Sequence, residues 1–471
     1  MRKTKIICTL GPSSNDEKTI RELCLAGMNV ARLNFSHGTH EEHLVLINLV
    51  KKVREELGLP IAIMLDTKGP EYRIGEFADH KVNLVDGQDF TFTTEKIMGD
   101  ETRVSVNYDK LCDDLSVGDT ILVNDGLVIF EVRDIKAPDI FCKVITGGAL
   151  SGKKSMSFPG KVMHQVFLSE QDKLDIKFGI DNDVDYIAAS FVSNKENVLD
   201  IKNFLIENNA PDIGIVAKIE NQSGVDNIRE ICEECEGVMV ARGDLGVEIP
   251  FKLLPSTQKK LITACRLHGK RVITATEMLE SMIHNPRPTR AEISDVANAV
   301  YDGTSAVMLS GETAAGKYPV RTVQVMSEIC EATENSIDYQ KRFYATKFEI
   351  RNNIDAISHS ACNMALMVDA RAIAVCSLSG ATVRMVSRFR PHADIVGLTT
   401  DRKAWRKLAL SWGVIPVLNE TYPSPEVMFY TAMKSTKKLL GLDNGENIII
   451  VGGTTSGVSG ETDTIRLIKT Y

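Results

Sequence analysis

Short apolar runs separated by helical stretches constrain the fold of this chain more than any other feature. Eight such runs lie between residues 5 and 312, and they read KIICTLG, NVARLNFS, IAIMLDT, YIAASFV, GIVAKIE, GVMVARGD, RVITATEM and AVMLSGE. Strands that are apolar on both faces and alternate with helices are typical of a parallel sheet covered by helices. Eight of them predict an α/β fold, a (β/α)8 TIM barrel. An open doubly wound sheet is the alternative.

Two segments depart from this alternation and predict further domains. Residues 74–159 show alternating strand patterns with Asp-Gly and Gly-Gly turns, which indicates a small all-β domain inserted in a barrel loop. From residue 345 onward, runs such as AIAVCSLSG and NIIIVGG alternate with helical segments and predict a C-terminal three-layer α/β domain. We therefore expect the barrel at residues 1–73 and 160–344, the inserted domain at 74–159 and the C-terminal domain at 345–471.

Charge and cysteine content exclude several classes of partner. The formal net charge is −8 and no block of Lys and Arg stands out, so we expect no nucleic-acid partner. No apolar run approaches the roughly 18 residues that span a bilayer, so we expect no membrane partner. The ten cysteines have irregular spacing, which predicts reduced thiols and a cytoplasmic location.

Polar side chains gather where the predicted barrel strands end. They are Arg32, Asn34 and Ser36; Asp66, Thr67 and Lys68; Ser190; Lys218 and Glu220; Arg242, Gly243 and Asp244; Thr276; and Ser310 and Glu312. In a TIM barrel the carboxyl ends of all eight strands meet at one face. The sequence therefore predicts one site built from residues that are far apart in the chain.

The residue types at these strand ends favour phosphoryl transfer. Glu220 and Asp244 follow neighbouring predicted strands, and two carboxylates suit Mg²⁺ or Mn²⁺, which fill their remaining positions with water and substrate oxygens. Arg32 and Lys218 add fixed positive charge, which suits a phosphoryl group bridged to the metal. Because the transition state of phosphoryl transfer is loose, the protein contributes mainly by positioning the reactants and by neutralising charge.

A second cluster and the inserted domain complete the predicted site. The second cluster is rich in oxygen ligands for a monovalent cation and consists of Asn34, Ser36, Asp66 and Thr67. Neither a P-loop nor a Rossmann glycine motif opens a βα unit, so a nucleotide would be bound in another way. The inserted domain is placed to close over the mouth of the barrel as a lid and to exclude water.

Longer motifs resemble those of one enzyme family. The motifs CTLGP, RLNFSHG, LDTKGPEYR, KIENQSG, MVARGDLGVEIP, NPRPTRAE and DGTSAVMLSGETAAGKYP, together with the predicted domain layout, resemble the pyruvate kinase family. The resemblance implies transfer of the phosphoryl group of phosphoenolpyruvate to ADP, which gives pyruvate and ATP. It also implies Mg²⁺ (or Mn²⁺) and K⁺ as cofactors and a homotetramer.

The resemblance also implies a role for each residue that matches a family motif. Glu220 and Asp244 would hold Mg²⁺, Arg32 and Lys218 would grip the transferring phosphoryl group, and Lys218 would also steady the enolate. The substrate carboxylate would meet the backbone of Gly243 and Asp244 together with Thr276. The remaining implied roles are K⁺ binding by Asn34, Ser36, Asp66 and Thr67, proton relay by Thr276 and Ser310, and nucleotide binding by Pro12, His37, Arg73 and Lys154.

The turn SLSGATVR in the C-terminal part predicts a regulatory site. Hydroxyls of Ser377, Ser379 and Thr382, with the amides of a helix start, form a cradle for a phosphate. The alternative is a plain βα turn with a serine cap. Since Ala381 and the closing loop GGTTSGVSGETD supply no cation for a second phosphate, we expect a sugar monophosphate or nucleoside monophosphate as effector rather than a bisphosphate.

Two other functions stay open at this point. A barrel lyase or aldolase would use Lys218 as a Schiff-base amine, which needs a lysine with a lowered pKa, and the nearby Glu220 argues against that. A catalytically silent relative that only binds metabolites is the other alternative.

Overall fold

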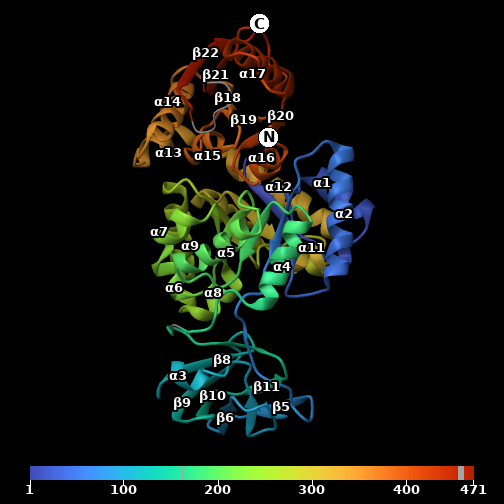
Figure 1. Ribbon diagram of the computed structural model, residues 1–471, viewed down its shortest axis with the longest axis vertical. Coiled ribbons are helices and arrows are strands. Elements are labelled where there is room, and N and C mark those ends of the chain that lie inside the picture. The colour runs from blue at the N-terminus through green and yellow to red at the C-terminus, as the bar shows by residue number, and fades with distance from the viewer. Residues whose placement is uncertain (162, 454–460) are drawn as a thin grey trace.

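The computed structural model describes residues 1–161, 163–453 and 461–471. Eight parallel strands close into a barrel in the order β1-β17-β16-β15-β14-β13-β3-β2 (Figure 1). These strands are β1 (Lys5–Thr9), β2 (Val30–Asn34), β3 (Ala62–Asp66), β13 (Tyr186–Ala189), β14 (Gly214–Ile219), β15 (Gly237–Ala241), β16 (Arg271–Ala275) and β17 (Ala306–Leu309). The predicted TIM barrel is confirmed, and the open sheet is wrong because β1 pairs with both β2 and β17.

Helices surround the barrel, and polar caps define where several of them begin. The helices are α1 (Glu17–Ala26), α2 (His40–Leu57), α4 (Glu170–Asp181), α5 (Lys195–Glu207), α6 (Gln222–Asp226), α7 (Ile228–Glu234), α8 (Arg242–Glu248), α9 (Leu254–Leu267), α10 (Arg290–Asp302), α11 (Gly311–Ala314) and α12 (Pro319–Asn335), with 3-10 turns η1 (Pro12–Ser14), η2 (Phe251–Leu253) and η3 (Glu280–Ile283). Thr39 and Glu42 form a capping box at α2, as Thr289 and Glu292 do at α10. Gly303 ends α10 with a φ of 97°, a left-handed conformation that favours glycine.

The inside of the barrel is filled by side chains. Ile7, Val216, Met239 and Ile273 belong to one buried cluster within it. Leu410, from the C-terminal part of the chain, belongs to the same cluster and closes the amino-terminal end of the barrel. The interior is therefore a packed core, and chemistry is confined to the carboxyl end.

The inserted segment forms a separate β-rich unit with its own core. Its elements are β4 (Tyr72–Arg73), β5 (Lys81–Leu84), β6 (Asp89–Thr93), β7 (Arg103–Ser105), α3 (Leu111–Asp114), β8 (Thr120–Val123), β9 (Val128–Lys136), β10 (Asp139–Thr146), β11 (Gly148–Ser151) and β12 (Ser155–Ser157). The short helix α3 means that the segment is not purely β. Figure 1 shows this unit below the barrel, at the end opposite the C-terminal part.

The C-terminal part is a sheet covered by helices on both faces. Its elements are α13 (Tyr339–Ala345), α14 (Asn353–Met367), β18 (Ala372–Cys376), α15 (Ala381–Arg388), β19 (Asp394–Thr399), α16 (Arg402–Leu408), β20 (Val414–Leu418), α17 (Pro425–Leu440), β21 (Asn447–Gly452) and β22 (Thr464–Lys469). Ile373 and Val375 pack toward α14 and α15, whereas Ala374 and Cys376 pack toward α17. The predicted three-layer α/β arrangement is confirmed.

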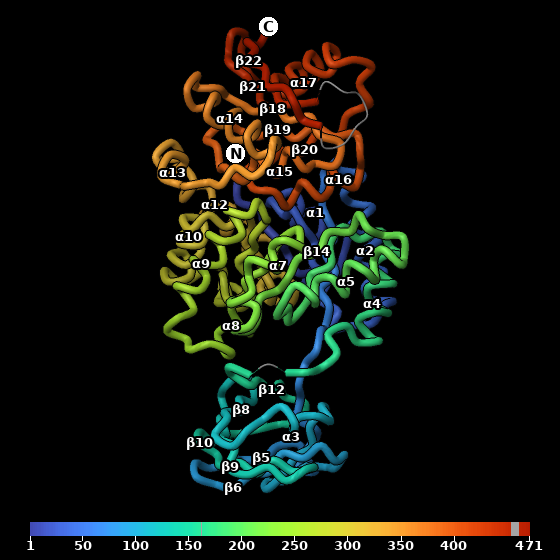
Figure 2. Tube along the Cα trace, turned by 60° about the vertical axis from the view of Figure 1, so that its left-hand side comes forward, coloured from blue at the N-terminus to red at the C-terminus, as the bar shows by residue number. Residues whose placement is uncertain are grey.

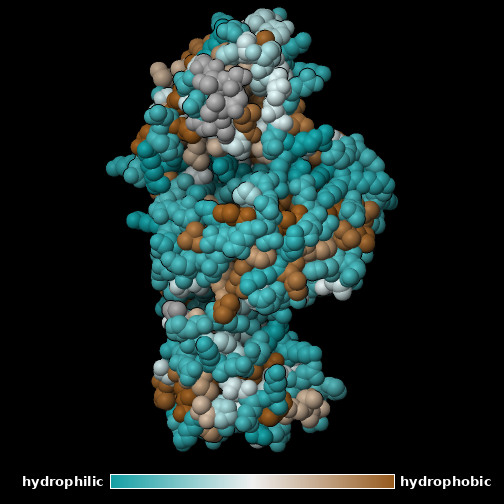
Figure 3. Space-filling view, viewed as in Figure 1, coloured by the Kyte–Doolittle hydropathy of each residue, from teal (hydrophilic) through white to brown (hydrophobic). Residues whose placement is uncertain are grey.

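Three units are thus arranged along one axis. We propose residues 1–73 and 160–344, 74–159, and 345–471 as their extents. Figure 2 places the N-terminus at the junction of the barrel with the C-terminal unit. Teal, hydrophilic residues cover most of the face in Figure 3, and among the described residues no helix is long and apolar enough to cross a membrane.

Candidate active site

An arginine and an aspartate form a buried ion pair at the carboxyl ends of β2 and β3. Nε of Arg32 lies 2.6 Å from Oδ2 of Asp66, and Nη1 of Arg32 donates to the hydroxyl of Thr9 at 2.9 Å. Arg32 is 8% exposed and Asp66 is fully buried. The arginine in the strand is therefore both paired and held at the mouth of the barrel.

Lys218, at the end of β14, extends this pair into a network of four charged residues, Arg32, Asp66, Lys218 and Glu220. Its Nζ lies 3.0 Å from Oδ1 of Asp66 and 3.0 Å from Oε1 of Glu220. It also donates to Oγ of Ser190 at 2.6 Å. Residues that are more than 150 positions apart in the chain thus meet at one face of the barrel, as the strand-end rule predicts.

The network keeps its lysine charged but leaves Glu220 short of positive charge. Burial alone would lower the pKa of Lys218, but Asp66 and Glu220 outweigh burial and raise it. Burial would raise the pKa of Asp66, yet Arg32 and Lys218 hold it below its usual value. For Glu220, burial and the charge of Asp244 outweigh Lys218 and raise the pKa to about 7.

The surroundings of Glu220 fit a bound divalent cation. Its Oε2 accepts a 2.6 Å hydrogen bond from the amide of Phe191, which fixes the carboxylate. Asp244, in the first turn of α8, supplies the second carboxylate from the next strand. Burial raises the pKa of Glu220, and the neighbouring charge of Asp244 adds to this effect. No group of three or more His, Cys, Asp or Glu ligands occurs in the described ranges, so the remaining ligands of Mg²⁺ would be water and substrate oxygens.

The residues predicted to bind the substrate carboxylate and to relay the proton follow three neighbouring strands, β15, β16 and β17. The amide of Gly243 donates to the hydroxyl of Thr276 at 2.8 Å, and this hydroxyl donates to the carbonyl of Ala275 at 2.6 Å. Thr276 has a φ of 68°, a strained conformation for a β-branched residue. The hydroxyl of Ser310 is buried and has no hydrogen-bond partner in the part of the chain that the structure describes.

The predicted K⁺ ligands lie at or just beyond the ends of two neighbouring strands, β2 and β3. Asn34 lies opposite Asp66 in the β2–β3 register, and its Oδ1 accepts a hydrogen bond from the amide of Ser36 at 3.2 Å. Thr67 follows Asp66, and its hydroxyl accepts from the amide of Ser190 at 3.2 Å. The structure therefore brings these four residues together, although Arg32 and Lys218 already contact both oxygens of Asp66.

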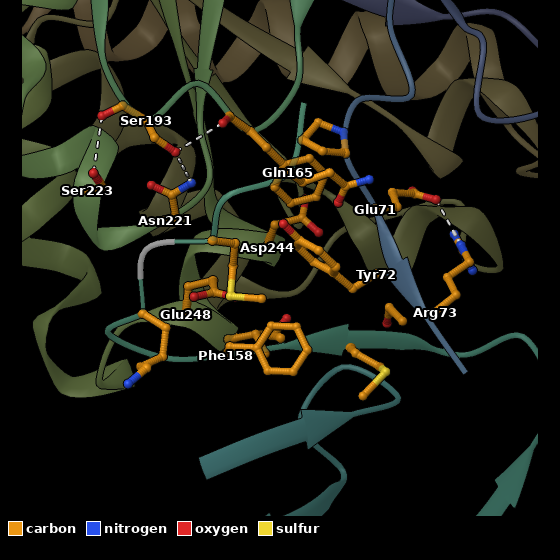
Figure 4. A pocket seen from close by; sticks show the side chains of 18 of the residues that line it. Glu71, Tyr72, Arg73, Phe158, Gln165, Ser193, Asn221, Ser223, Asp244 and Glu248 are labelled. Carbon is orange, nitrogen blue, oxygen red and sulfur yellow. Dashed lines mark hydrogen bonds and ion pairs between the residues drawn. The ribbon is translucent and has the colours of Figure 1, made fainter. Parts of the chain in front are cut away.

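A cavity of about 410 Å³ opens between the lid and the barrel. Arg73, Lys154 and Asp244 line it, whereas Pro12 and His37 are not among its lining residues. Arg73 donates to Oε2 of Glu71 at 2.8 Å, and Figure 4 shows this pair across the cavity from Ser193 and Asn221. Two of the four predicted nucleotide residues thus share a cavity with a predicted metal ligand, and the other two lie elsewhere on the barrel face.

Sequence reasoning assigned no role to three groups of this site. Thr9 orients Arg32, Ser190 accepts from Lys218, and the amide of Phe191 holds Glu220. Thr9 ends β1, so the strand-end rule would have found it. The amide of Phe191 belongs to the backbone, so no residue type in the sequence indicates its role, and it could be found only from the structure.

The predicted effector turn follows β18. Gly380, with a φ of 74°, precedes α15, and the hydroxyls of Thr382 and Thr462 are 2.6 Å apart. Ser377 and Ser379 lie in the same turn. Residues 454–460 of the predicted closing loop lie outside the described residues.

Comparison with known proteins gives concordant matches. One family model, described as "Pyruvate kinase, barrel domain", matches residues 1–323, and another, "Pyruvate kinase, alpha/beta domain", matches residues 355–468. A pyruvate kinase of Bacillus licheniformis is 46% identical over 100% of this chain and 80% of its own length. One of Clostridium acetobutylicum is 44% identical over 99% of both chains. A crystal structure of a pyruvate kinase from Cryptosporidium parvum matches with a TM-score of 0.96 at 37% identity, covering 100% of this chain and 96% of its own.

Proposed function

The chain belongs to the pyruvate kinase family, and from this premise we propose how its own residues carry out the reaction. It is a glycolytic phosphotransferase that moves the phosphoryl group of phosphoenolpyruvate to ADP, which gives pyruvate and ATP. The family is generally metal dependent.

The observation that carries the proposed mechanism is the contact of Lys218 with both Asp66 and Glu220, beside Arg32. An oxygen of the ADP β-phosphate attacks phosphorus while the bond to the enol oxygen breaks. Arg32 and Lys218 neutralise the charge on the phosphoryl oxygens, and Lys218 stays close to the enolate oxygen as negative charge develops there. Asp66 holds both cations in place.

Glu220 and Asp244 would hold Mg²⁺ or Mn²⁺, which supplies further neutralisation of the phosphoryl oxygens when bound. Asn34, Ser36, Asp66 and Thr67 would hold K⁺ close to Arg32. The two carboxylates at adjacent strand ends support the first assignment. The register of Asn34 with Asp66 supports the second.

The enolate must finally accept a proton at its methylene carbon. We assign this step to Thr276 and Ser310, with water between them and the substrate. The hydroxyl of Ser310 is buried and has no hydrogen-bond partner among the described residues, which supports its part in such a relay. The substrate carboxylate would accept hydrogen bonds from the amides of Gly243 and Asp244. For this, the amide of Gly243 must give up its hydrogen bond to the hydroxyl of Thr276.

The nucleotide phosphates would meet Arg73 and Lys154 in the cavity beneath the lid, with Pro12 and His37 on the opposite side of the nucleotide. Closure of the lid would bring the two pairs together and exclude water. This assignment rests on the position of Arg73 and Lys154 in the wall of the cavity.

Regulation and assembly complete the proposal. Ser377, Ser379 and Thr382 would bind the phosphate of a sugar monophosphate or nucleoside monophosphate. The enzyme would be a cytoplasmic homotetramer, and the ten free cysteines agree with a reducing compartment.

A coupled assay of pyruvate formation, run with and without Mg²⁺ and K⁺, tests the proposal directly. We expect activity only when both ions are present. A lack of pyruvate under all conditions would favour the catalytically silent relative. Borohydride trapping with substrate tests the Schiff-base alternative, which the raised pKa of Lys218 opposes because a protonated amine is no nucleophile.

A further inference from the structure

A small cavity at the junction of the barrel with the C-terminal unit is lined by cationic side chains. Its volume is about 10 Å³. The six cations that line it are Arg266, Lys270, Arg271, Arg384, Arg388 and Arg390. No carboxylate is among its lining residues, but the hydroxyls of Ser305, Ser387 and Ser411 are. The cavity therefore offers positive charge and hydrogen-bond donors, which are the groups that bind an anion.

Nearby carboxylates neutralise only some of these cations. Arg271 and Arg384 both contact Glu236, and Arg388 lies 3.0 Å from Asp355. The other three, Arg266, Lys270 and Arg390, form no ion pair within the described ranges. Lys270 donates to the carbonyl of Cys235 at 2.8 Å, which supplies no net charge.

Arg390 is the most deeply placed of the unneutralised cations. It is 4% exposed, and its Nη atoms donate to the carbonyls of Gly303 and Ser387 and to the hydroxyl of Ser305. Its Nε is buried without a hydrogen-bond partner among the described residues. Such a group costs free energy unless a counter-charge or further acceptor is present.

Arg266 brings a second guanidinium to the same place. A Cβ built on Gly303 would lie 3.1 Å from Nη1 of Arg266, so Arg266 and Arg390 both adjoin this glycine. The Nε of Arg266 is also buried and unpartnered in the described part of the chain. Burial, followed by the charges of Arg266 and Arg342, lowers the pKa of Arg390 well below its usual value. Burial and Arg342 lower the pKa of Arg266 to about 10.

Three nearby features stabilise these cations only in part. The carboxyl end of α10, at Gly303, carries roughly −0.5 elementary charge from the helix dipole, which is too little for two guanidinium groups and an ammonium. The ring of Trp412 lies 4.7 Å from Cζ of Arg390 but has no net charge. Glu334 already accepts hydrogen bonds from the amides of Lys3 and Thr4.

We propose that this cavity binds a small inorganic anion, which holds the barrel and the C-terminal unit together. A cavity of about 10 Å³ is close to the smallest that holds one water molecule, so its size favours a monatomic anion such as chloride, which is slightly larger than water, over a polyatomic oxyanion. The barrel contributes Arg266 and Lys270 to the site, and the C-terminal unit contributes Arg390. The anion would therefore stabilise the junction between the two units, far from the metal and substrate site.

Bromide makes the site directly visible in crystals of the full-length wild-type enzyme. We expect an anomalous bromide peak within hydrogen-bond distance of Arg266 or Arg390. A cavity that holds only water, or a carboxylate from a neighbouring subunit, would overturn the proposal.

Thermal unfolding provides the test in solution. At constant K⁺ and constant ionic strength, we expect replacement of gluconate by chloride to raise the Tm of the wild type by a few degrees and then to saturate. In Arg266→Gln this increase should disappear, whereas Arg371→Gln, which removes an exposed arginine paired with Glu446, should retain it. Equal chloride responses in the wild type and Arg266→Gln would contradict the proposal.

Discussion

Glu220 and Glu236 lie at opposite ends of the barrel and show opposite charge balance. Glu220 follows β14 at the carboxyl end, and Glu236 directly precedes β15 at the amino end. Within the described ranges Glu220 contacts one cation, Lys218, at 3.0 Å. Glu236 contacts three, with Lys407 at 2.7 Å, Arg271 at 3.0 Å and Arg384 at 3.2 Å.

The two carboxylates consequently differ in pKa. Burial raises the pKa of Glu220 to about 7, whereas at Glu236 the charges of Arg384, Lys407 and Arg271 overcome burial and lower the pKa to about 2. The three cations around Glu236 are already in place, which suits a permanent contact between units. Glu220, at the carboxyl end, shares its single cation with Asp66, which suits a site that binds and releases a metal ion.

The largest expected effect is on catalysis, from the loss of the lysine at the carboxyl end. Lys218→Met should lower kcat by several orders of magnitude and leave the KM for phosphoenolpyruvate within a few-fold, because the charge matters most where negative charge develops. Steady-state kinetics measures both parameters. The matched variant at the amino end, Lys407→Met, should lower the Tm but retain most of kcat. Similar losses of kcat in the two variants would contradict the assignment of Lys218.

The next effect concerns the metal. Glu220→Gln should weaken Mn²⁺ binding by about 100-fold or more, because even the loss of a group that only orients a metal ligand costs about 10–100-fold. Titration of free Mn²⁺ by electron paramagnetic resonance measures the affinity without any need for activity. Glu236→Gln is the control, and its Mn²⁺ affinity should match that of the wild type. If Glu220→Gln also matches the wild type, Glu220 is no metal ligand.

The third prediction concerns the contribution of Glu236, at the amino end of the barrel, to the stability of the protein. Glu236→Gln leaves three cations without their anion and should cost about 3 kcal/mol at neutral pH, seen as a lower Tm. Since the pKa of Glu236 is lowered from 4.5 to about 2, its stabilisation is complete above about pH 4.5 and is lost as the pH falls through about 2.

Thermal unfolding at a series of pH values tests the sign of this effect. The difference in Tm between the wild type and Glu236→Gln should be largest near pH 6 and should shrink toward pH 2. A difference that does not change with pH would mean that the ionised form of Glu236 contributes nothing to stability.

The site at the carboxyl end of the barrel could be predicted from the sequence because each of its residues follows a strand pattern that is visible locally in the sequence. Each strand pattern ends in a polar residue, and one rule places all these ends at one face, so Arg32, Asp66, Lys218 and Glu220 were found without the structure. Their partners were not all found. The hydrogen bond between Gly243 and Thr276 depends on a backbone conformation that no residue type signals. The separation of Pro12 and His37 from the cavity depends on the position of the lid.

The amino end could not be predicted in the same way. Glu236 and Lys407 are 171 positions apart and belong to different units, and no periodic pattern relates them. Arg390 and Gly303 are 87 positions apart and meet only because the C-terminal unit sits on the barrel. Residues of this kind look like ordinary surface charges in the sequence, and their burial follows from how two finished units pack.

The smallest effect tests how far the junction influences the carboxyl end. The hydroxyl of Tyr186, at the start of β13, donates to the carbonyl of Lys407 across the junction at 2.7 Å. Its ring packs inside the barrel, so Tyr186→Phe removes the hydrogen bond and keeps the packing. We expect a loss of about 1 kcal/mol in stability and an unchanged kcat, since Lys218 and Glu220 contact neither group. A lower kcat with an unchanged Tm would show that the junction adjusts the catalytic strand ends, and the two ends would then act as one unit.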